Sequence, residues 1–363
     1  MRIAFVANPA SLHIARWVRE FEGRGMECRL YAPVRTQAQA EEKRLIEAIS
    51  IGRQGWTGVV STIARVADLQ EKLARFGPDV IHAHFALGYG TWAALSGFKP
   101  MVLTCMGTDL LVAPNLSLSN RWKVCAALSS ADMVTVNAGH LGDAAVRLGA
   151  HPARVVRVVQ GVNAGLLAPP DRSARSSDPV LLSTRMLAPV YHLDDVLHAA
   201  ALLAQRGRRF RLHLAGSGPM EDELRALARR LGLGDRVSFL GFLNSDEALA
   251  RAYQMADIGI SVSASDGASV AVLEAMACGL PMVASYIPAN REWLEPGSGN
   301  FLVPVGDVEA IAAALEKLLE DRTLRAAAGR QNRRVVEQRA TWKTEMDRME
   351  SHYRNLVARH SGA

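Results

Sequence analysis

The chain has 363 residues, of which 49% are hydrophobic and 21% are charged, a balance that excludes a disordered protein and favours two globular domains over one. It contains no apolar run of about 18 residues that could span a membrane and no signal-peptide layout, so we expect a cytoplasmic protein. The four cysteines lack paired metal-ligand spacing, which indicates buried free thiols rather than a zinc site or a disulfide framework.

The net charge of +6 lies entirely in the first half of the chain. Residues 1–170 contain 18 Lys and Arg against 12 Asp and Glu, whereas residues 171–363 contain 24 of each sign. This asymmetry favours an anionic partner for the first half, such as a lipid diphosphate or the inner face of a cell membrane on which the protein would lie peripherally. An ordinary solvated surface is the alternative. Because no nucleic-acid-binding pattern occurs, we expect no nucleic acid partner.

Short apolar strands alternate with amphipathic helices along both halves, which is typical of parallel sheets with helices on both faces. In the first half, the expected strands are 2–7, 28–31, 80–84, 101–104, 133–136 and 154–159. In the second half, they are 180–183, 210–215, 237–240, 257–262, 282–285 and 300–303. The stretch 169–179 is rich in Pro, Ser and charge and predicts a linker. We therefore expect Rossmann-like domains at 1–170 and 171–340, facing a central cleft, and a C-terminal helix at 341–363.

Polar side chains lie at two strand ends of the first half. After the first strand, Ser11 is the expected N-cap of the next helix, and His13 follows it. His82 and His84 are two residues apart on one strand and therefore share a face, with His84 at the end that faces the cleft. A metal site would need a third ligand that the sequence does not supply, so we expect none.

Arg185 follows the first strand of the second half, where a guanidinium at a strand end can bind two oxygens of a diphosphate. A surface ion pair is the alternative role for this side chain. Gly216 and Gly218 form a turn between the next strand and its helix. Their spacing is not that of a dinucleotide fingerprint, which argues against NAD, and the motif also serves ordinary tight turns.

The most informative stretch is 256–281. An alternating strand ends before Asp266, and good helix formers follow from Ser269 until Gly279 and Pro281 stop them. Glu274 lies inside that helix, where it can reach a sugar hydroxyl. A phosphate-binding helix N-terminus would be formed by the backbone N–H groups of Gly267, Ala268, Ser269 and Val270. Alternatively, the two carboxylates only complement the helix dipole.

Asp266 and Glu274 resemble the carboxylate pair of the retaining glycosyltransferases of family 4, which is usually Glu, seven residues and Glu. The resemblance is strongest between residues 180 and 310. It also includes Arg185 and the segments 161–163, 214–219 and 239–243. It implies the GT-B fold, a C-terminal helix that packs back on the first domain, and a reaction without a metal or other cofactor.

The resemblance further implies that the second domain binds a nucleotide diphosphate sugar. Arg185 and Asp266 are then catalytic residues that contact the donor, and Glu274 binds the ribose hydroxyls. The other implied donor-binding residues are Gly216, Gly218, Gly241, Phe242, Leu243, Gly267, Ala268, Ser269 and Val270.

The first domain would hold the acceptor, a hydroxyl of a glycan or of a lipid-linked intermediate. His84 and Asp109 are the implied catalytic residues there, although Asp109 could equally cap the turn that follows it. The other residues expected near the acceptor are Ser11, His13, Met106, Gly107, Thr108, Tyr191 and His192.

Three positions depart from the family pattern. Met106 stands where the family's Thr-x-His-Gly-Thr-Asp segment has His, Val190 stands where Lys is common, and Asp266 replaces Glu. Because a branch of the family carries Pro-x-Tyr at the place of 189–191, we interpret the site as a variant of an active one.

We therefore predict a metal-independent retaining glycosyltransferase that uses a UDP- or GDP-sugar in bacterial cell-surface glycan synthesis. A non-catalytic nucleotide-sugar-binding homologue is the alternative from another class. A nucleotide-sugar epimerase or a phosphorylase on the same fold is the alternative enzyme, since a fold does not fix a function.

Overall fold

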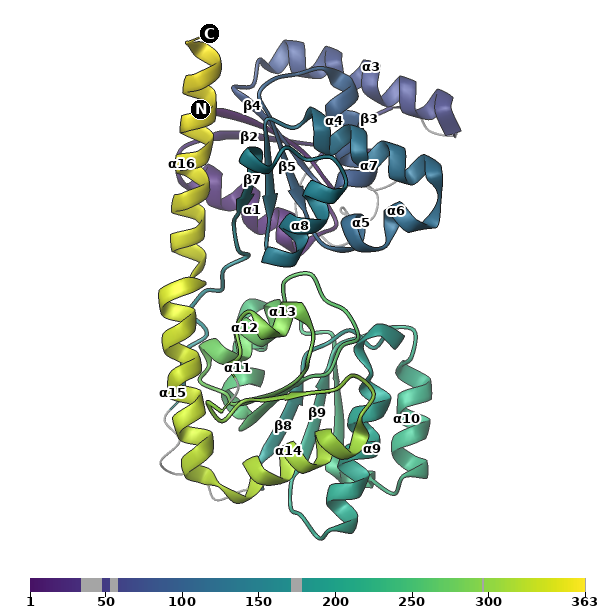
Figure 1. The fold of residues 1–363 in the computed structure, drawn as a ribbon, viewed down its shortest axis with the longest axis vertical. Helices are drawn as coiled ribbons and strands as arrows, with labels where there is room; N and C mark the ends of the chain where they lie inside the picture. Colours follow the sequence, from purple (N-terminus) through teal and green to yellow (C-terminus); the bar gives the residue numbers. More distant parts are fainter. Residues whose placement is uncertain (34–47, 53–57, 171–177, 296, 363) are drawn as a thin grey trace. The chain divides into compact units, whose positions relative to one another are not determined.

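A computed structural model describes residues 1–33, 48–52, 58–170, 178–295 and 297–362 (Figure 1). The chain divides into two compact units: unit 1 comprises Met1–Val159 and Met346–Ala363, and unit 2 comprises Gln160–Glu345. We expected domain boundaries at residues 170 and 340, whereas this division falls after Val159 and after Glu345. The predicted linker at 169–179 lies largely outside the described residues.

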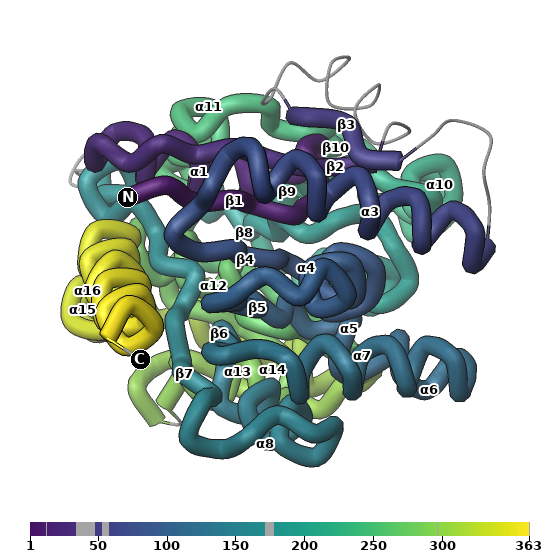
Figure 2. Tube along the Cα trace, turned by 90° about the horizontal axis from the view of Figure 1, so that it is seen from above, coloured from purple at the N-terminus to yellow at the C-terminus, as the bar shows by residue number. Residues whose placement is uncertain are grey.

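Unit 1 is built on a seven-stranded parallel sheet with the order β3-β2-β1-β4-β5-β6-β7, which Figure 2 shows from one edge to the other. The strands are β1 (Arg2–Val6), β2 (Glu27–Pro33), β3 (Ile49–Ile51), β4 (Val80–His84), β5 (Met101–Cys105), β6 (Met133–Val136) and β7 (Val155–Arg157). The helices are α1 (Leu12–Gly23), α3 (Gly58–Phe76), η1 (Ala86–Gly90), α4 (Thr91–Ser96), α5 (Thr108–Leu111), α6 (Ala113–Leu116), α7 (Leu118–Ser130), α8 (Gly139–Arg147) and η2 (Pro152–Arg154).

The last helix, α16 (Trp342–Ser361), contributes its larger part to unit 1. Tyr353 is fully buried there, with its ring centroid 5.2 Å from that of Phe21. At the end of α1, Arg24 forms ion pairs with Asp347 at 2.8 Å and Glu350 at 2.9 Å. These contacts fix residues from the two ends of the chain against each other.

Unit 2 has a six-stranded parallel sheet with the order β10-β9-β8-β11-β12-β13. The strands are β8 (Val180–Ser183), β9 (Arg211–Ala215), β10 (Val237–Gly241), β11 (Ile258–Ser261), β12 (Met282–Ser285) and β13 (Phe301–Val303). The helices are η3 (Pro189–Tyr191), α9 (Leu193–Gln205), α10 (Glu221–Arg230), η4 (Gly234–Arg236), α11 (Asp246–Met255), α12 (Val270–Ala277), α13 (Pro288–Arg291), α14 (Val308–Glu320) and α15 (Arg322–Arg339).

The inner strands are apolar without alternation because helices cover both faces of each sheet. Every residue of β4, β5, β8 and β11 is buried. The predicted fold class is therefore confirmed, and every strand expected from the sequence is present. The structure adds one strand that the sequence did not predict: β3, an edge strand of three residues, is too short to show a periodicity.

Two smaller expectations need comment. All four cysteines are free, but only Cys105 and Cys278 are buried, whereas Cys28 and Cys125 are half-buried. No helix in the described residues has the length and apolar character that a membrane span requires.

The strand orders place two pairs of loops at topological switch points, between β1 and β4 in unit 1 and between β8 and β11 in unit 2. Ligands of open α/β sheets bind outside the carboxyl ends of the strands at such points. Arg185 follows β8 and Asp266 follows β11, while His84 ends β4. The fold thus gathers the predicted residues at the switch points of the two sheets.

Candidate functional site

The switch point of unit 2 brings together two predicted residues that are far apart in the sequence. Arg185 Nη2 lies 2.8 Å from Asp266 Oδ2, and the side chains are only 10% and 16% exposed. The face of the guanidinium packs over the ring of Tyr191, with its central carbon 4.3 Å from the ring centroid. Arg185 is therefore a largely buried cation held by one carboxylate and one aromatic ring, and not a surface ion pair.

The loop that carries Tyr191 is tied to the loop that carries Asp266. The amide of Ala264 donates a 2.8 Å hydrogen bond to the carbonyl of Val190. Val190 itself is 40% exposed. At the position where the family commonly has lysine, this chain thus has an exposed apolar side chain, and Tyr191 stacks on the remaining cation.

Gly216 and Gly218 have a steric role that the sequence did not reveal. A Cβ atom at Gly216 would lie 2.4 Å from the carbonyl oxygen of Arg185, and one at Gly218 would lie 2.3 Å from that of Leu187. The two loops are joined by hydrogen bonds from the Leu187 amide to Ser217 O (3.1 Å) and from the Met220 amide to Leu187 O (3.0 Å). The glycines therefore allow the backbone that positions Arg185 to pack directly on this turn.

We expect Gly216→Ala to destabilise the protein by about 1–3 kcal/mol, because the added methyl group must push the Arg185 backbone away. Urea unfolding at neutral pH measures this change. Gly139→Ala is the matched control, since a Cβ there meets nothing within 4 Å. Equal stability of the two variants would contradict the close approach.

Glu274 is buried in α12, with 9% of its surface exposed. Its Oε2 accepts a 3.0 Å hydrogen bond from the hydroxyl of Tyr253, which also lies 2.6 Å from Thr184 Oγ1. Burial and, second, the Glu274 carboxylate raise the pKa of Tyr253 well above its ordinary value, so the hydroxyl stays protonated and can donate. Tyr253 thus connects Glu274 to the residue beside Arg185.

The segment before α12 is held in a strained shape. Ser269, the N-cap, is fully buried with a left-handed backbone (φ 48°, ψ 44°), which costs a non-glycine residue about 1–2 kcal/mol. Its hydroxyl donates to Asn290 Oδ1 at 2.6 Å, and Asn290 Nδ2 donates to Ser285 O at 2.8 Å. Ser285 Oγ in turn donates to Ser263 O at 2.5 Å. This buried network offsets the strain.

The strained segment leaves backbone donors at the start of α12. The amides of Gly267, Ala268 and Ser269 donate no hydrogen bond to any residue that the structure describes. The first helical amides of Val270 and Ala271 lie in the same turn. Orphan donors at a helix N-terminus suit an anion, as the sequence predicted for this loop.

At the end of β10 the chain turns at Gly241, which has a φ of 70°. Phe242 is 65% exposed, and Leu243 is half-buried. These three residues are therefore accessible, and their contact with a nucleotide stays a prediction.

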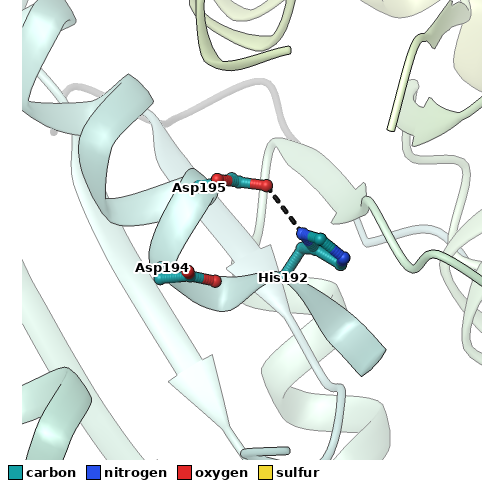
Figure 3. A group of neighbouring side chains, drawn as sticks. All are labelled: His192, Asp194 and Asp195. Atoms are coloured by element: carbon teal, nitrogen blue, oxygen red, sulfur yellow. Dashed lines mark hydrogen bonds and ion pairs between the residues drawn. The ribbon is translucent and has the colours of Figure 1, made fainter. Parts of the chain in front are cut away.

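His192 and the first turn of α9 form the group of possible metal ligands that the described residues contain (Figure 3). His192 Nδ1 lies 2.8 Å from Asp195 Oδ2, and Asp194 completes the group. Both aspartates lie in the first turn of the helix, where carboxylates complement the dipole. The arrangement is therefore explained as the start of a helix.

In unit 1, Asp109 is fully buried, and its carboxylate accepts hydrogen bonds from backbone amides. Its Oδ1 accepts from the amides of Met106 (3.0 Å) and Gly107 (2.9 Å), and its Oδ2 accepts from the amide of Ala86 (2.8 Å). Burial raises its pKa, while these hydrogen bonds oppose the shift. Of the two roles considered, the contacts are those of a residue that fixes the turn and joins it to η1.

The neighbours of Asp109 differ in exposure. Met106 is half-buried, Thr108 is exposed, and Gly107 has a φ of 123° that only glycine adopts readily. Ser11 is the N-cap of α1 as expected, but its side chain makes no capping hydrogen bond. Instead, Asn8 Oδ1 accepts from the amide of Ala10 at 3.0 Å.

Three histidines of unit 1, the buried His82 and His84 and the half-buried His13, form an aromatic cluster with Trp17. The ring centroid of His84 lies 4.2 Å from that of His82, 4.9 Å from that of Trp17 and 5.8 Å from that of His13. Burial lowers the pKa of His13 and His82 to about 3, with Arg16 and His13 respectively as second causes. It also lowers the pKa of His84 well below the ordinary value, with His82 and His13 adding to the shift. All three are therefore neutral at pH 7.

Two of these histidines differ in their partners. His82 Nδ1 pairs with the hydroxyl of Tyr353, and its Nε2 lies 2.6 Å from Thr104 Oγ1. His84 is 3% exposed, and neither of its ring nitrogens has a hydrogen-bond partner among the described residues. The sequence placed His84 toward a cleft, whereas the structure buries it in this cluster.

Two positioning residues were missed by the sequence analysis, Tyr253 and Asn290. Tyr253 lies in the amphipathic helix α11, and Asn290 lies in the four-residue helix α13. A tyrosine or an asparagine at a core position is a weak signal that a polar partner lies opposite.

Comparison with known proteins assigns both units to one class. Residues 2–138 match the family described as glycosyl transferase 4-like, and residues 169–335 match the family described as glycosyl transferases group 1. The two matches together include most of the chain.

Among curated relatives, the D-inositol 3-phosphate glycosyltransferase of Mycobacteroides abscessus is 30% identical over 304 residues, which are 77% of this chain and 66% of that protein. The N-acetyl-alpha-D-glucosaminyl L-malate synthase of Bacillus anthracis is 25% identical over 287 residues, 76% of this chain and 74% of that protein. The chain spans less than two thirds of several other relatives, such as 62% of the D-inositol 3-phosphate glycosyltransferase of Geodermatophilus obscurus.

Solved structures agree on the fold. The sucrose-phosphate synthase of Thermosynechococcus elongatus gives a TM-score of 0.82 at 20% identity, over 99% of both chains. Anabaena Alr3699/HepE in complex with UDP-glucose gives 0.81 at 20% identity, over 98% of this chain and 100% of that one. With both sheets, both family matches and these neighbours in agreement, the chain belongs to the group 1, family 4-like glycosyltransferases of the GT-B fold.

Proposed function

We propose that this chain is a retaining glycosyltransferase that moves a sugar from a nucleoside diphosphate sugar to a hydroxyl of a glycan or lipid-linked acceptor. The observation that carries the proposal is the buried pair of Arg185 and Asp266 at the switch point of unit 2. A desolvated cation beside orphan helix amides suits the charge that a departing diphosphate develops.

In the proposed site each group has one role. Arg185 and the amides of 267–270 bind the diphosphate, and Glu274 accepts hydrogen bonds from the ribose hydroxyls. Asp266 binds a hydroxyl of the donor sugar. Since Asp266 is paired with Arg185 in this structure, the diphosphate has to compete with it for the guanidinium.

The proposed reaction exchanges one bond at the anomeric carbon. The acceptor oxygen forms a bond to that carbon on the face from which the diphosphate leaves, so the configuration is retained. The carbon–oxygen bond to the phosphate breaks, and the acceptor proton passes to a departing phosphate oxygen. Arg185 and the helix amides stabilise the released negative charge, so the proposal assigns no step to a metal or cofactor.

The acceptor site is proposed in unit 1, at the carboxyl ends of β1, β4 and β5. The residues proposed to line it there are Ser11, His13, His84, Met106, Gly107 and Thr108. Asp109 acts as a positioning residue through the backbone of Met106 and Gly107. We propose a bacterial glycan as the product, assembled at the cytoplasmic face of the membrane.

The donor is proposed to be a UDP- or GDP-sugar. The complex of Anabaena Alr3699/HepE with UDP-glucose makes UDP the first nucleotide to test. Incubation with each nucleotide sugar and a mixture of hydroxyl acceptors should release the nucleoside diphosphate. NMR of the product should show the anomeric configuration of the donor. Binding without release would support the non-catalytic alternative, and an inverted product would exclude retention.

Tyr253→Phe should weaken donor binding about tenfold, because the Glu274 carboxylate loses the hydrogen bond that holds it. Titration calorimetry with the nucleoside diphosphate measures this loss. Tyr191→Phe is the control, since the ring over Arg185 is kept. If the ribose is removed from the ligand, as in inorganic diphosphate, the two variants should bind alike. Equal nucleotide affinity of Tyr253→Phe and the native protein would contradict the role of Tyr253.

A further inference from the structure

The corner between α6 and α7 in unit 1 exposes large apolar side chains. Leu118 is 87% exposed, Leu116 72%, Trp122 64% and Val112 48%. Together with two cations they form what we call the α6–α7 patch, defined as Val112, Leu116, Leu118, Arg121, Trp122 and Lys123. Figures 1 and 2 both show α6 and the start of α7 on the side of unit 1 away from α16.

A helix cap and buried side chains hold this corner in place. Ser117 caps α7 by accepting a hydrogen bond from the amide of Asn120 at 3.1 Å. Val124, Ala127 and Leu128 anchor the helix in the core. Leu118 and Trp122 are four residues apart and therefore share the outer face of α7. The exposure thus belongs to a packed helix whose inner face is already occupied.

The segment that carries the patch has charge of one sign. No Asp or Glu occurs between Leu110 and Ala131. Arg121 is exposed and Lys123 is half-buried, and neither forms an ion pair with any described residue. The patch lies in the half of the chain that carries the whole net charge of +6.

We infer that the α6–α7 patch docks unit 1 on an anionic lipid bilayer. Leucine side chains and a tryptophan ring suit the boundary between headgroups and acyl chains, and flanking Arg and Lys suit anionic headgroups. A second copy of the chain is a poorer occupant, because a two-fold interface buries the same patch of both copies and would gather four cations with no Asp or Glu from the same segment. This inference does not depend on the donor chemistry proposed above.

The test is co-sedimentation of the full chain with vesicles. The native protein should bind vesicles with about a third phosphatidylglycerol, bind phosphatidylcholine vesicles far less, and bind more weakly when the salt concentration rises to about 0.5 M. Leu118→Ser with Trp122→Ser should weaken binding about tenfold or more, and Arg121→Gln with Lys123→Gln should remove most of the preference for the anionic lipid.

Met255→Ser with Val305→Ser is the matched control, since it removes two exposed apolar side chains from unit 2 (57% and 41% exposed) and should leave vesicle binding unchanged. Stabilisation by nucleotide should be the same in all these proteins, which separates a failure of the patch from a failure of the donor site. No binding of the native protein to anionic vesicles would overturn the inference, as would unchanged binding of the Leu118 and Trp122 variant. If the native protein is a dimer and the Leu118 and Trp122 variant is a monomer, the patch binds a second copy of the chain and not a bilayer, which would also overturn the inference.

Discussion

Replacing Arg185 by alanine is expected to lower kcat/KM for sugar transfer about 10²- to 10³-fold, because one preorganised donor to the leaving group is lost from a buried site. The guanidinium is held by Asp266 at 2.8 Å and by the face of Tyr191, so its position is fixed before the donor arrives. Arg185→Lys should recover only part of the rate, since an ammonium group keeps the charge but loses the fork that binds two oxygens. Steady-state release of nucleoside diphosphate measures both variants.

Two further variants separate this role from a general charge effect. Arg229→Ala removes an exposed arginine of α10 and should leave the rate unchanged. Asp266→Asn should bind the free nucleoside diphosphate more tightly, because the guanidinium is no longer neutralised, yet should transfer sugar more slowly. A rate for Arg185→Ala within a few-fold of the native value would remove Arg185 from the proposed chemistry.

Lowering the pH from 7.5 to 5.5 is expected to reduce the stability of unit 1 by about 4 kcal/mol. The pKa of His13 and of His82 is about 3 in the folded state, and that of His84 is well below its ordinary value, against about 6.5 in the unfolded chain. Between these values the unfolded chain binds more protons, so stability falls as the pH falls through 6.5. Below pH 6.5 each of the three histidines contributes about 1.4 kcal/mol per pH unit. The change from pH 7.5 to 5.5 covers about one such unit.

His84→Phe tests this account, because it removes one of the three titrating groups. The variant should lose about a third of the pH dependence and be at least as stable as the native protein at pH 7.5, since neither ring nitrogen of His84 has a partner among the described residues. Urea unfolding at the two pH values measures both effects. His198→Gln, at an exposed position of α9, is the control. A flat profile for the native protein would contradict the neutral cluster.

The same variant also tests the predicted acceptor role of His84. If His84 contacts the acceptor, His84→Phe should transfer sugar more slowly although it is more stable. Such an exchange of activity for stability is common when a buried polar group at a functional site is replaced. If the residue only packs against Trp17, both activity and stability are kept.

The sequence predicted the strands well because inner parallel strands are continuous apolar runs, as in β4 and β11. It did not predict β3, whose three residues carry no pattern. The approach of Arg185 to Asp266 follows from strand order, which no local periodicity encodes. The resemblance to a family placed both residues at the donor site, but it did not predict that they pair with each other.

Other features could not be predicted because they depend on three-dimensional contacts alone. A Gly-x-Gly turn indicates a tight turn or a phosphate site, but not that Gly216 and Gly218 press on the backbone around Arg185. The sequence around Asp109 does not reveal whether its carboxylate contacts a substrate or accepts hydrogen bonds from three backbone amides. The burial of His84 depends on Trp17, which approaches it from another element.

The central claim is that unit 2 binds a nucleotide sugar through Glu274 and the loop before α12. Thermal unfolding with UDP-, GDP-, ADP- and dTDP-sugars tests it most directly, on the native protein and on Glu274→Gln, which keeps the volume and still accepts from Tyr253. At about 100 times its dissociation constant, the correct nucleotide should stabilise the native protein by about 2.7 kcal/mol and the variant clearly less. No stabilisation by any nucleotide sugar, or equal stabilisation of both proteins, would contradict the proposed site.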